Sequence, residues 1–333
     1  MIKSMNYREI IADSWKYTQA NKKLIFWFGF LPSILTTTVG VGYIAYQVFA
    51  FKSSYLFSEE EHSFLGQVVK FIWDFIHTHL SWTAPLIVFA IIFAILYFLF
   101  PTLAQASAVQ MIARNRNNQK AGVGTGLRHG LMSFLPLFEY HLLIKTFTFF
   151  SILIEMAFVL RNLGPTIFKL LLPVFIIFII ISFVLLLLFT YTDFYIVIDN
   201  LPVFDSMKKS AKMVIMHWKH TFLITILMLL IGLRIILQVI VVFLIPVVIV
   251  LITGYLATVT LPVTGVIVGG IVGFVALLIA AYLSGIVDIF SYTVWTYTFL
   301  NLTAEKELSA REVFNENIPA STSDSHGHKN LES

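Results

Sequence analysis

Four ionisable residues lie in stretches of the sequence that are otherwise largely apolar: Glu155, Asp193, Arg234 and Asp288. A charge inside a bilayer is costly, so such residues are functional candidates by default, either on a pathway or in a buried pair. Arg234 and Asp288 are the strongest of the four. If they face each other, the resulting ion pair would fix the packing of two helices without performing chemistry.

Two estimates of the depth of Arg234 and Asp288 in the bilayer disagree, so whether the two residues form an ion pair stays open. Measured from the cytoplasmic ends of their helices, the two residues lie within about 3 Å of each other in depth. Measured from the outer turn near Ala257, they differ by roughly 12 Å. The first count favours a direct ion pair. The second favours an Arg234 side chain that extends to the inner headgroups, while Asp288 accepts hydrogen bonds from nearby hydroxyls.

Asp193 and Glu155 are lone acids near opposite ends of their apolar stretches. Asp193 lies among tyrosines and a threonine, so we expect its carboxylate to be hydrogen-bonded or in contact with water. Together with Asp288, the two acids could line a proton or ion pathway, but the three residues fall at different depths. A polar position inside a belt of aromatic residues is the preferred interpretation of Asp193.

The patterns that usually carry catalysis or a cofactor are missing from the sequence. There is no metalloprotease, nucleophile-elbow or Walker pattern, and the lack of cysteine excludes thiol catalysis and disulfides. GVGTG at 122–126 lacks the third glycine of a dinucleotide-binding loop and is interpreted as a flexible link. His77 and His79 form no closed ligand spacing with the acids at 59–61. We therefore expect no metal, no cofactor and no enzymatic activity.

The composition places these residues in a membrane protein. Hydrophobic residues make up 58% of the 333 residues and charged residues 12%, where soluble domains have about 25% charged residues. The mean hydropathy is +0.87. Four windows contain no charge, at 24–51, 84–113, 170–189 and 235–287, and about 20 apolar residues suffice to cross the hydrocarbon core.

Six spans are expected, of which the third is interrupted by Lys145 and Glu155. They lie at about 24–50, 84–112, 141–160, 168–198, 220–251 and 263–299. Thirteen basic residues lie before the first span and in the loops after the second and fourth spans, against four in the alternate loops. This positive-inside bias predicts a multi-pass protein of the cell membrane with both termini in the cytoplasm.

The same unit occurs three times: a cytoplasmic amphipathic segment, a span outward and a span back. Such basic amphipathic segments lie in the headgroup plane. The return spans end at a polar exit, at Asn115, Asn200 and Asn301. All three units enter from the cytoplasm, so the repeats are parallel, which argues against an inverted-repeat transporter.

Two of the return spans end in similar sequences, FTYTDFYIVIDN at 189–200 and FSYTVWTYTFLN at 290–301. Tyr, Trp and Thr suit the membrane interface, where a ring keeps an apolar body in lipid and a polar tip in water. We therefore expect both segments to form an interfacial belt that faces the headgroups.

Small residues follow one side of the last span at helical spacing. They are Gly265, Gly269, Gly273, Ala276, Ala280 and Ser284. A stripe of small residues lets another helix approach closely. Packing within the chain is the simpler interpretation, and dimerisation is the alternative.

The segments DSWKYTQANKKLIF and DSMKKSAKMVIMHWKHTF each introduce a helical hairpin. In this pattern, residues 1–302 resemble a bacterial superfamily that includes YciC-like proteins and the membrane domain fused to some glycerophosphodiester phosphodiesterases. The resemblance implies a six-helix membrane domain and supplies no catalytic residues to carry over. The phosphodiesterase domain itself is absent.

The sequence thus predicts an all-α integral membrane protein over 1–302, with an outer amphipathic segment at 51–82 and a disordered polar tail at 303–333. The net charge of +4 lies beside the spans, so it indicates anionic headgroups at the cytoplasmic face, not nucleic acid. The preferred function is a non-enzymatic module that binds lipid or docks a protein partner. The alternative is a small-solute or ion transporter that uses Arg234 and Asp288.

Overall fold

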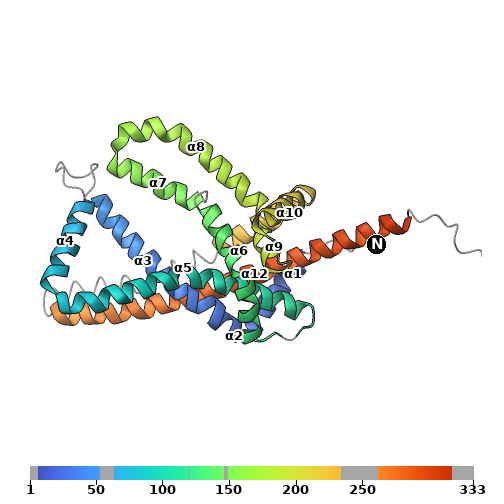
Figure 1. The fold of residues 1–333 in the computed structure, drawn as a ribbon, viewed down its shortest axis with the longest axis horizontal. Coiled ribbons are helices and arrows are strands. Elements are labelled where there is room, and N and C mark those ends of the chain that lie inside the picture. The colour runs from blue at the N-terminus through green and yellow to red at the C-terminus, as the bar shows by residue number, and fades with distance from the viewer. Residues whose placement is uncertain (1–6, 53–63, 120, 146–148, 234–261, 317–333) are drawn as a thin grey trace, which may run out of the picture.

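The computed structural model describes residues 7–52, 64–119, 121–145, 149–233 and 262–316 (Figure 1). Every regular element among these residues is a helix, which confirms the predicted all-α class. The helices are α1 (Tyr7–Ala20), α2 (Lys22–Leu24), the π-helix η1 (Ile25–Phe30), α3 (Leu31–Lys52), α4 (Phe64–Thr78), α5 (Leu80–Arg116), α6 (Val123–Lys145), α7 (Phe149–Asn162), α8 (Gly164–Leu188), α9 (Thr192–Val197), α10 (Val203–Met216), the unlabelled helix Trp218–Leu233 and α12 (Pro262–Glu316).

Four of the described helical segments are long and apolar enough to cross a membrane. They are Lys22–Tyr43, Ser81–Arg116, Gly164–Leu188 and Gly270–Ala304. A fifth is added if α10 and Trp218–Leu233, which meet at a bend of 97°, count as one span. The predicted third span at 141–160 and fifth span at 220–251 include residues outside the described ranges. The count of six therefore stays a prediction.

The buried core lies at one end of the spans, where α1, α6, α9 and α10 gather around the C-terminal end of α5 and the middle of α12 (Figure 1). Most of its residues come from three segments, 104–113, 191–197 and 289–302, which are the ends of the three predicted return spans. Away from this end, α3 and α5 diverge towards α4, and α7 and α8 form a separate hairpin. Most large apolar side chains there are exposed, as expected of lipid-facing surface.

The two similar sequences pack against each other inside this core. Phe299 of α12 stacks on Phe194 at 5.9 Å between ring centroids and meets Tyr195 edge-on at 4.9 Å. Trp295 contacts Tyr191, also edge-on, at 5.9 Å. The expected belt facing the headgroups is therefore wrong, because Tyr191 is fully buried and Phe299 nearly so. Aromatic pairs of this kind are more favourable than their buried area alone implies.

Thr293 and Thr298 can be buried here because their hydroxyls find partners within their own helix. Thr293 donates to the carbonyl of Ile289 at 2.7 Å, and Thr298 donates to that of Val294 at 2.8 Å. A hydroxyl bonded four residues back needs no water. The residue types that suggested a wet interface are thus compatible with a dry core.

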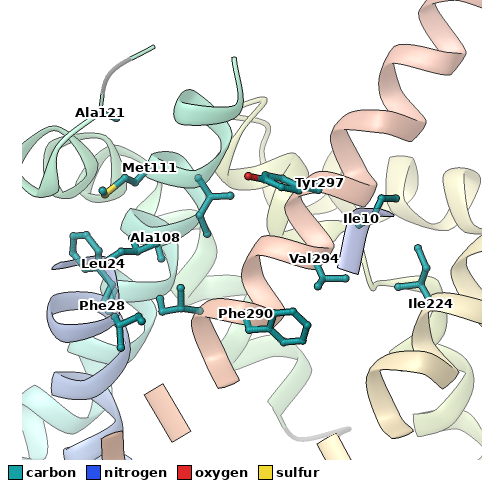
Figure 2. Packing of buried hydrophobic residues seen from close by; sticks show 14 residues of the cluster. Ile10, Leu24, Phe28, Ala108, Met111, Ala121, Ile224, Phe290, Val294 and Tyr297 are labelled. Atoms are coloured by element: carbon teal, nitrogen blue, oxygen red, sulfur yellow. The ribbon is translucent and has the colours of Figure 1, made fainter. Parts of the chain in front are cut away.

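A second part of the core joins the first and last helices (Figure 2). Ile10 of α1 and Phe28 of η1 belong to the same buried cluster as Ala108 of α5 and Val294 of α12. On the outer side of this cluster, Trp15 packs edge-on against a ring of α12, that of Phe290, at 5.5 Å. The N-terminal helix is therefore part of the core and not only a surface segment.

The three asparagines predicted to end the return spans behave differently. Asn200 has a positive φ of 53° and follows the end of α9. Asn115 donates to the Tyr17 hydroxyl at 2.8 Å and accepts from the amide of Ala121 at 3.0 Å, which ties α5 to α1 and to the start of α6. Burial raises the pKa of the Tyr17 hydroxyl, and the bond with Asn115 opposes this rise. Asn301 does not end a helix, because it lies inside α12.

The end of α12 lies beyond the predicted end of the last span. The helix continues to Glu316, so the prediction of disorder is wrong for residues 303–316, while 317–333 lie outside the described residues. The segment TAEKELSAREVF is rich in Ala, Glu, Leu, Lys and Arg, which favour helix even where a segment is polar. Polarity alone was a poor guide to disorder.

GVGTG at 122–126 leads into α6 and is not a flexible link. A side chain on Gly126 would lie 3.2 Å from the carbonyl oxygen of Ser107. One turn later, a Cβ on Gly130 would lie 2.7 Å from the amide nitrogen of Ser107. These glycines allow α6 to lie directly against the backbone of α5.

The closest approach of α12 to the first span is made by Gly285 and Gly29. A Cβ on Gly285 would lie 2.6 Å from the carbonyl carbon of Gly29, and one on Gly29 would lie 2.5 Å from the Gly285 oxygen. Most of the predicted stripe of small residues does not take part in this close contact. Gly265 and Gly269 are in α12, Gly273 has no atom within 4 Å of an added Cβ, Ala276 and Ala280 are half-buried, and Ser284 is exposed.

We predict that Gly285→Ala lowers the midpoint of thermal unfolding in detergent, because its methyl group would overlap backbone atoms of η1. Overpacking of this kind costs about 1–3 kcal/mol. Gly273→Ala is the matched control: it adds the same methyl group in open space, where alanine is favoured over glycine by about 1 kcal/mol in a helix. Equal midpoints for the two variants would contradict the close crossing.

Candidate functional site

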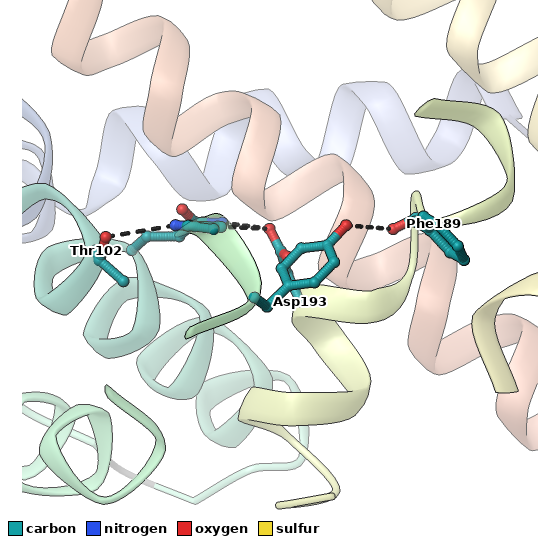
Figure 3. A network of polar contacts seen from close by, with 6 residues as sticks. Thr102, Phe189 and Asp193 are labelled. Atoms are coloured by element: carbon teal, nitrogen blue, oxygen red, sulfur yellow. Dashed lines mark hydrogen bonds and ion pairs between the residues drawn. The ribbon is translucent and has the colours of Figure 1, made fainter. Parts of the chain in front are cut away.

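Asp193 is the centre of a polar network between α5, α6 and α9 (Figure 3). Gln105 of α5 donates a hydrogen bond to its Oδ2 at 2.7 Å. Nε2 of His141, on α6, lies 3.6 Å from the same oxygen. The other oxygen, Oδ1, is buried and has no hydrogen-bond partner among the described residues. Asp193 is thus a specific junction between helices and not a lone polar position.

The break between α8 and α9 places Asp193 in this position. α8 ends at Leu188, and the chain turns before α9 begins at Thr192. Ser210 of α10 bridges the break, because its hydroxyl donates to the Leu188 carbonyl at 2.8 Å and accepts from the Tyr191 amide at 3.0 Å. The orphan groups of the broken helix are thereby satisfied.

His141 continues the network on its other side. Its Nδ1 lies 3.4 Å from the hydroxyl of Thr102 on α5. On the neighbouring residue, the Tyr140 hydroxyl donates to the Phe189 carbonyl at 3.4 Å. With the proton on Nε2, a neutral ring presents Nδ1 as the acceptor for Thr102. Asp193 and Thr102 therefore flank the imidazole of His141 on its two nitrogen atoms.

The order hydroxyl, imidazole, carboxylate is also that of a nucleophile, a base and an orienting acid. In such sites the nucleophile and base lie within about 2.6–3.2 Å, and both distances here are longer, at 3.4 Å and 3.6 Å. The arrangement holds a polar imidazole and a hydroxyl in fixed positions. Its geometry suits binding better than covalent chemistry.

Thr102 and His141 line a cavity of about 320 Å³ between α3, α5 and α6. Thr36 of α3 is the second threonine of its lining, and Tyr97 is also part of it. Aromatic and aliphatic side chains form the rest of the wall, including Phe98 and Phe138. The cavity thus combines an apolar wall with a small number of polar groups, which is typical of sites for small ligands.

The structure places the other sequence-predicted residues away from this network. Ser33 of α3 donates to Oδ2 of Asp288 at 3.2 Å. Arg234 lies outside the described residues, so its pairing with Asp288 stays a prediction. Glu155 is exposed on α7.

The sequence analysis missed Gln105, Thr102 and His141. Each is a polar residue in an apolar stretch, as in FPTLAQASAV and EYHLLI, and that is a usable signal. Their partners lie 39 to 88 positions away along the chain. Spacing along one helix says nothing about which turn of another helix will face it, so the cluster could not be assembled from spacing.

A separate feature lies on α10, at the same end of the molecule as the core. Val203, Ser206, Ser210 and Met213 are buried against the protein. The opposite side exposes Lys208, Lys209 and Lys212. The large apolar side chains Phe204 and Ile215 are exposed next to these lysines. α10 therefore presents a surface that is both basic and apolar, which we call the α10 surface.

Comparisons with protein-family models, with curated proteins and with solved structures gave no match. The resemblance to YciC-like proteins therefore stays a prediction. Within the described residues, no group of three or more His, Asp or Glu side chains could hold a metal ion.

We predict that Asp193→Leu destabilises the protein by about 1–3 kcal/mol, because Gln105 would lose its acceptor in a half-buried position. Asp193→Asn is the isosteric control: its carbonyl can still accept from Gln105, so we expect a smaller loss. Thermal unfolding in detergent measures both. If the leucine and asparagine variants unfold at the wild-type temperature, the network does not contribute to stability.

Proposed function

We propose that the chain is a six-span membrane protein with both termini in the cytoplasm, and that it acts as a non-enzymatic module that binds anionic lipid headgroups. The observation that carries this proposal is the α10 surface. Helices that lie at a membrane interface combine lysines with large apolar side chains in this way. The apolar side chains enter the headgroup region, and the lysines attract negative charge.

The geometry of α10 fits such a role because the helix is fixed to the core along its other side. The 97° bend before Trp218–Leu233 turns the chain from α10 into the next helix. Trp218 is exposed at this bend, and tryptophan is enriched at membrane interfaces. A helix fixed across the direction of its neighbour can lie in the membrane plane while the neighbour enters the bilayer.

α1 adds basic residues at the same end. Arg8, Lys16, Lys22 and Lys23 are exposed on or just after this helix. Its Asp13 lies 3.8 Å from Arg116 of α5, and the Arg116 guanidinium is 4.4 Å from the centre of the Tyr297 ring. These contacts hold α1 on the core and leave its lysines available. On this proposal, α1 and α10 form one basic surface against the inner leaflet.

We predict that Lys208→Gln/Lys212→Gln reduces the enrichment of anionic lipid around the protein by more than about tenfold, since each lysine near an anionic surface contributes about 1 kcal/mol. The protein is reconstituted in a mixture of phosphatidylglycerol and phosphatidylcholine and re-extracted gently. The ratio of the two co-purifying lipids is then measured by mass spectrometry.

The matched control is Lys70→Gln/Lys169→Gln, which removes two exposed lysines from α4 and α8, away from the core end. It should leave the lipid ratio unchanged. Equal ratios in both double variants, or an unenriched ratio in the wild-type protein, would count against lipid binding at the α10 surface.

The second proposal is a small-solute or ion transporter that uses Arg234 and Asp288. It is favoured by one observation: Asp288, inside the span Gly270–Ala304, accepts a hydrogen bond at 3.2 Å from Ser33 of the span Lys22–Tyr43, so a polar contact joins two spans. Its test is proton uptake into proteoliposomes, followed with a pH-sensitive dye. The transporter proposal predicts uptake that Asp288→Asn abolishes and that Glu155→Gln, on the exposed side of α7, leaves intact. The lipid-binding proposal predicts no uptake in any of the three proteins.

A further inference from the structure

The cavity between α3, α5 and α6 has the size of a site for one small ligand. Its volume of about 320 Å³ is at the lower end of the range of about 300–1,000 Å³ found for small-molecule sites. The space is too limited for the two chains of a phospholipid together with their headgroup. It fits a single chain or a compact ring.

The mouth of the cavity is apolar and lies on a membrane span. Phe98 and Leu142 line the cavity, and yet 53% and 51% of their surfaces are exposed. Phe98 belongs to the span Ser81–Arg116, and the large side chains before it, such as Ile91 and Ile95, are also exposed. In a bilayer this surface faces acyl chains. A ligand would therefore enter sideways from the membrane, with an apolar chain against these residues.

The polar side of the cavity carries no net positive charge. His141 is the one titratable side chain of the lining other than Tyr97, and it faces the Asp193 carboxylate, which Gln105 also contacts. The Tyr140 side chain, on the same helix, is directed to the Phe189 carbonyl. A protonated imidazole would thus be neutralised by Asp193. This environment does not favour a phosphate or carboxylate headgroup, so the matching head is uncharged.

The hydrogen bonds that Thr102 can still form determine which uncharged head group fits the site. When the His141 ring is neutral, the Thr102 hydroxyl donates to Nδ1, and its lone pairs can accept a hydrogen bond from a ligand. When the ring is protonated, Thr102 accepts from Nδ1 and can donate to a ligand. Thr36 donates within its own helix, to Pro32 and Ser33 carbonyls at 3.3 Å, and offers only lone pairs. A hydroxyl is both donor and acceptor, and it therefore matches Thr102 in either state.

We infer that this cavity is a binding site for a single-chain, uncharged lipid with a hydroxyl head, of the class of monoacylglycerols and long-chain alcohols. The hydroxyl bonds Thr102 beside His141, and the chain lies along Phe98 and Leu142. Asp193 and Gln105 act as positioning residues that fix the His141 ring. The site shares no residue with the α10 surface, so it can be present whether or not that surface binds anionic lipid.

The test is photolabelling of the purified full-length protein with a monoacylglycerol that carries a diazirine in its chain. We expect labelled peptides from the α5 and α6 segments around 98–102 and 138–144, and competition by unlabelled monoacylglycerol. Thr102→Val, which keeps the shape and removes the hydroxyl, should lower labelling about fivefold. Thr83→Val is the matched control, because Thr83 is also buried on α5 but donates to the carbonyls of Ile76 and His79, which do not line the cavity.

A second variant keeps the test valid if Thr102→Val does not fold. Leu142→Trp places a larger ring at the mouth and should cause a loss of labelling, while Leu143→Trp, exposed on the next position of α6 but not in the lining, should not. A diazirine fatty acid of the same chain length tests the charge of the head. Labelling that is spread over α8 as well, is unaffected by Leu142→Trp, or is stronger for the fatty acid than for the monoacylglycerol would overturn the inference.

Discussion

Helices that converge at one end of a membrane protein must bring their backbones close together and still find hydrogen-bond partners for their polar groups. Here small residues allow the close approach, and several buried hydroxyls bond within their own helices. Gly285 meets Gly29, and Thr293 and Thr298 donate to carbonyls one turn back. The aromatic rings of α9 and α12 fill the remaining space. The orientation of the spans, of α1 and of α10 depends on this packed end, because the opposite ends of α3, α5 and α8 make much less contact with the rest of the protein.

Apolar length was sufficient to predict the helical class and the existence of several helices long and apolar enough to cross a membrane. These properties depend on residues close together in sequence, since a charge-free window must be helical to enter lipid. The prediction that Tyr and Thr at 189–200 and 290–301 mark an interface failed for a physical reason. Those residue types suit a wet surface, but they also suit a core in which each hydroxyl has an internal partner. Composition alone cannot separate the two environments.

The polar network could not be predicted because it depends on helix rotation. Asp193 was a candidate from the start, but its partners Gln105 and His141 are defined by which faces of α5 and α6 turn towards α9. The same applies to the close crossing: Gly273 and Gly285 look equivalent in sequence, and only one of them meets another backbone. The helical part of 303–316 was missed because polarity was given more weight than the helix-forming residues in that segment.

The position of α1 also has a consequence for how the protein is made. Trp15 packs on Phe290, and Gly29 of the first span lies against Gly285. These partners are far apart along the chain, so α1 and η1 are synthesised well before α12. During synthesis, α1 and η1 keep apolar and small-residue faces uncovered until α12 is inserted. The packing of α1 and η1 is therefore completed only by α12, and a chain that stops before residue 285 would leave them without these partners.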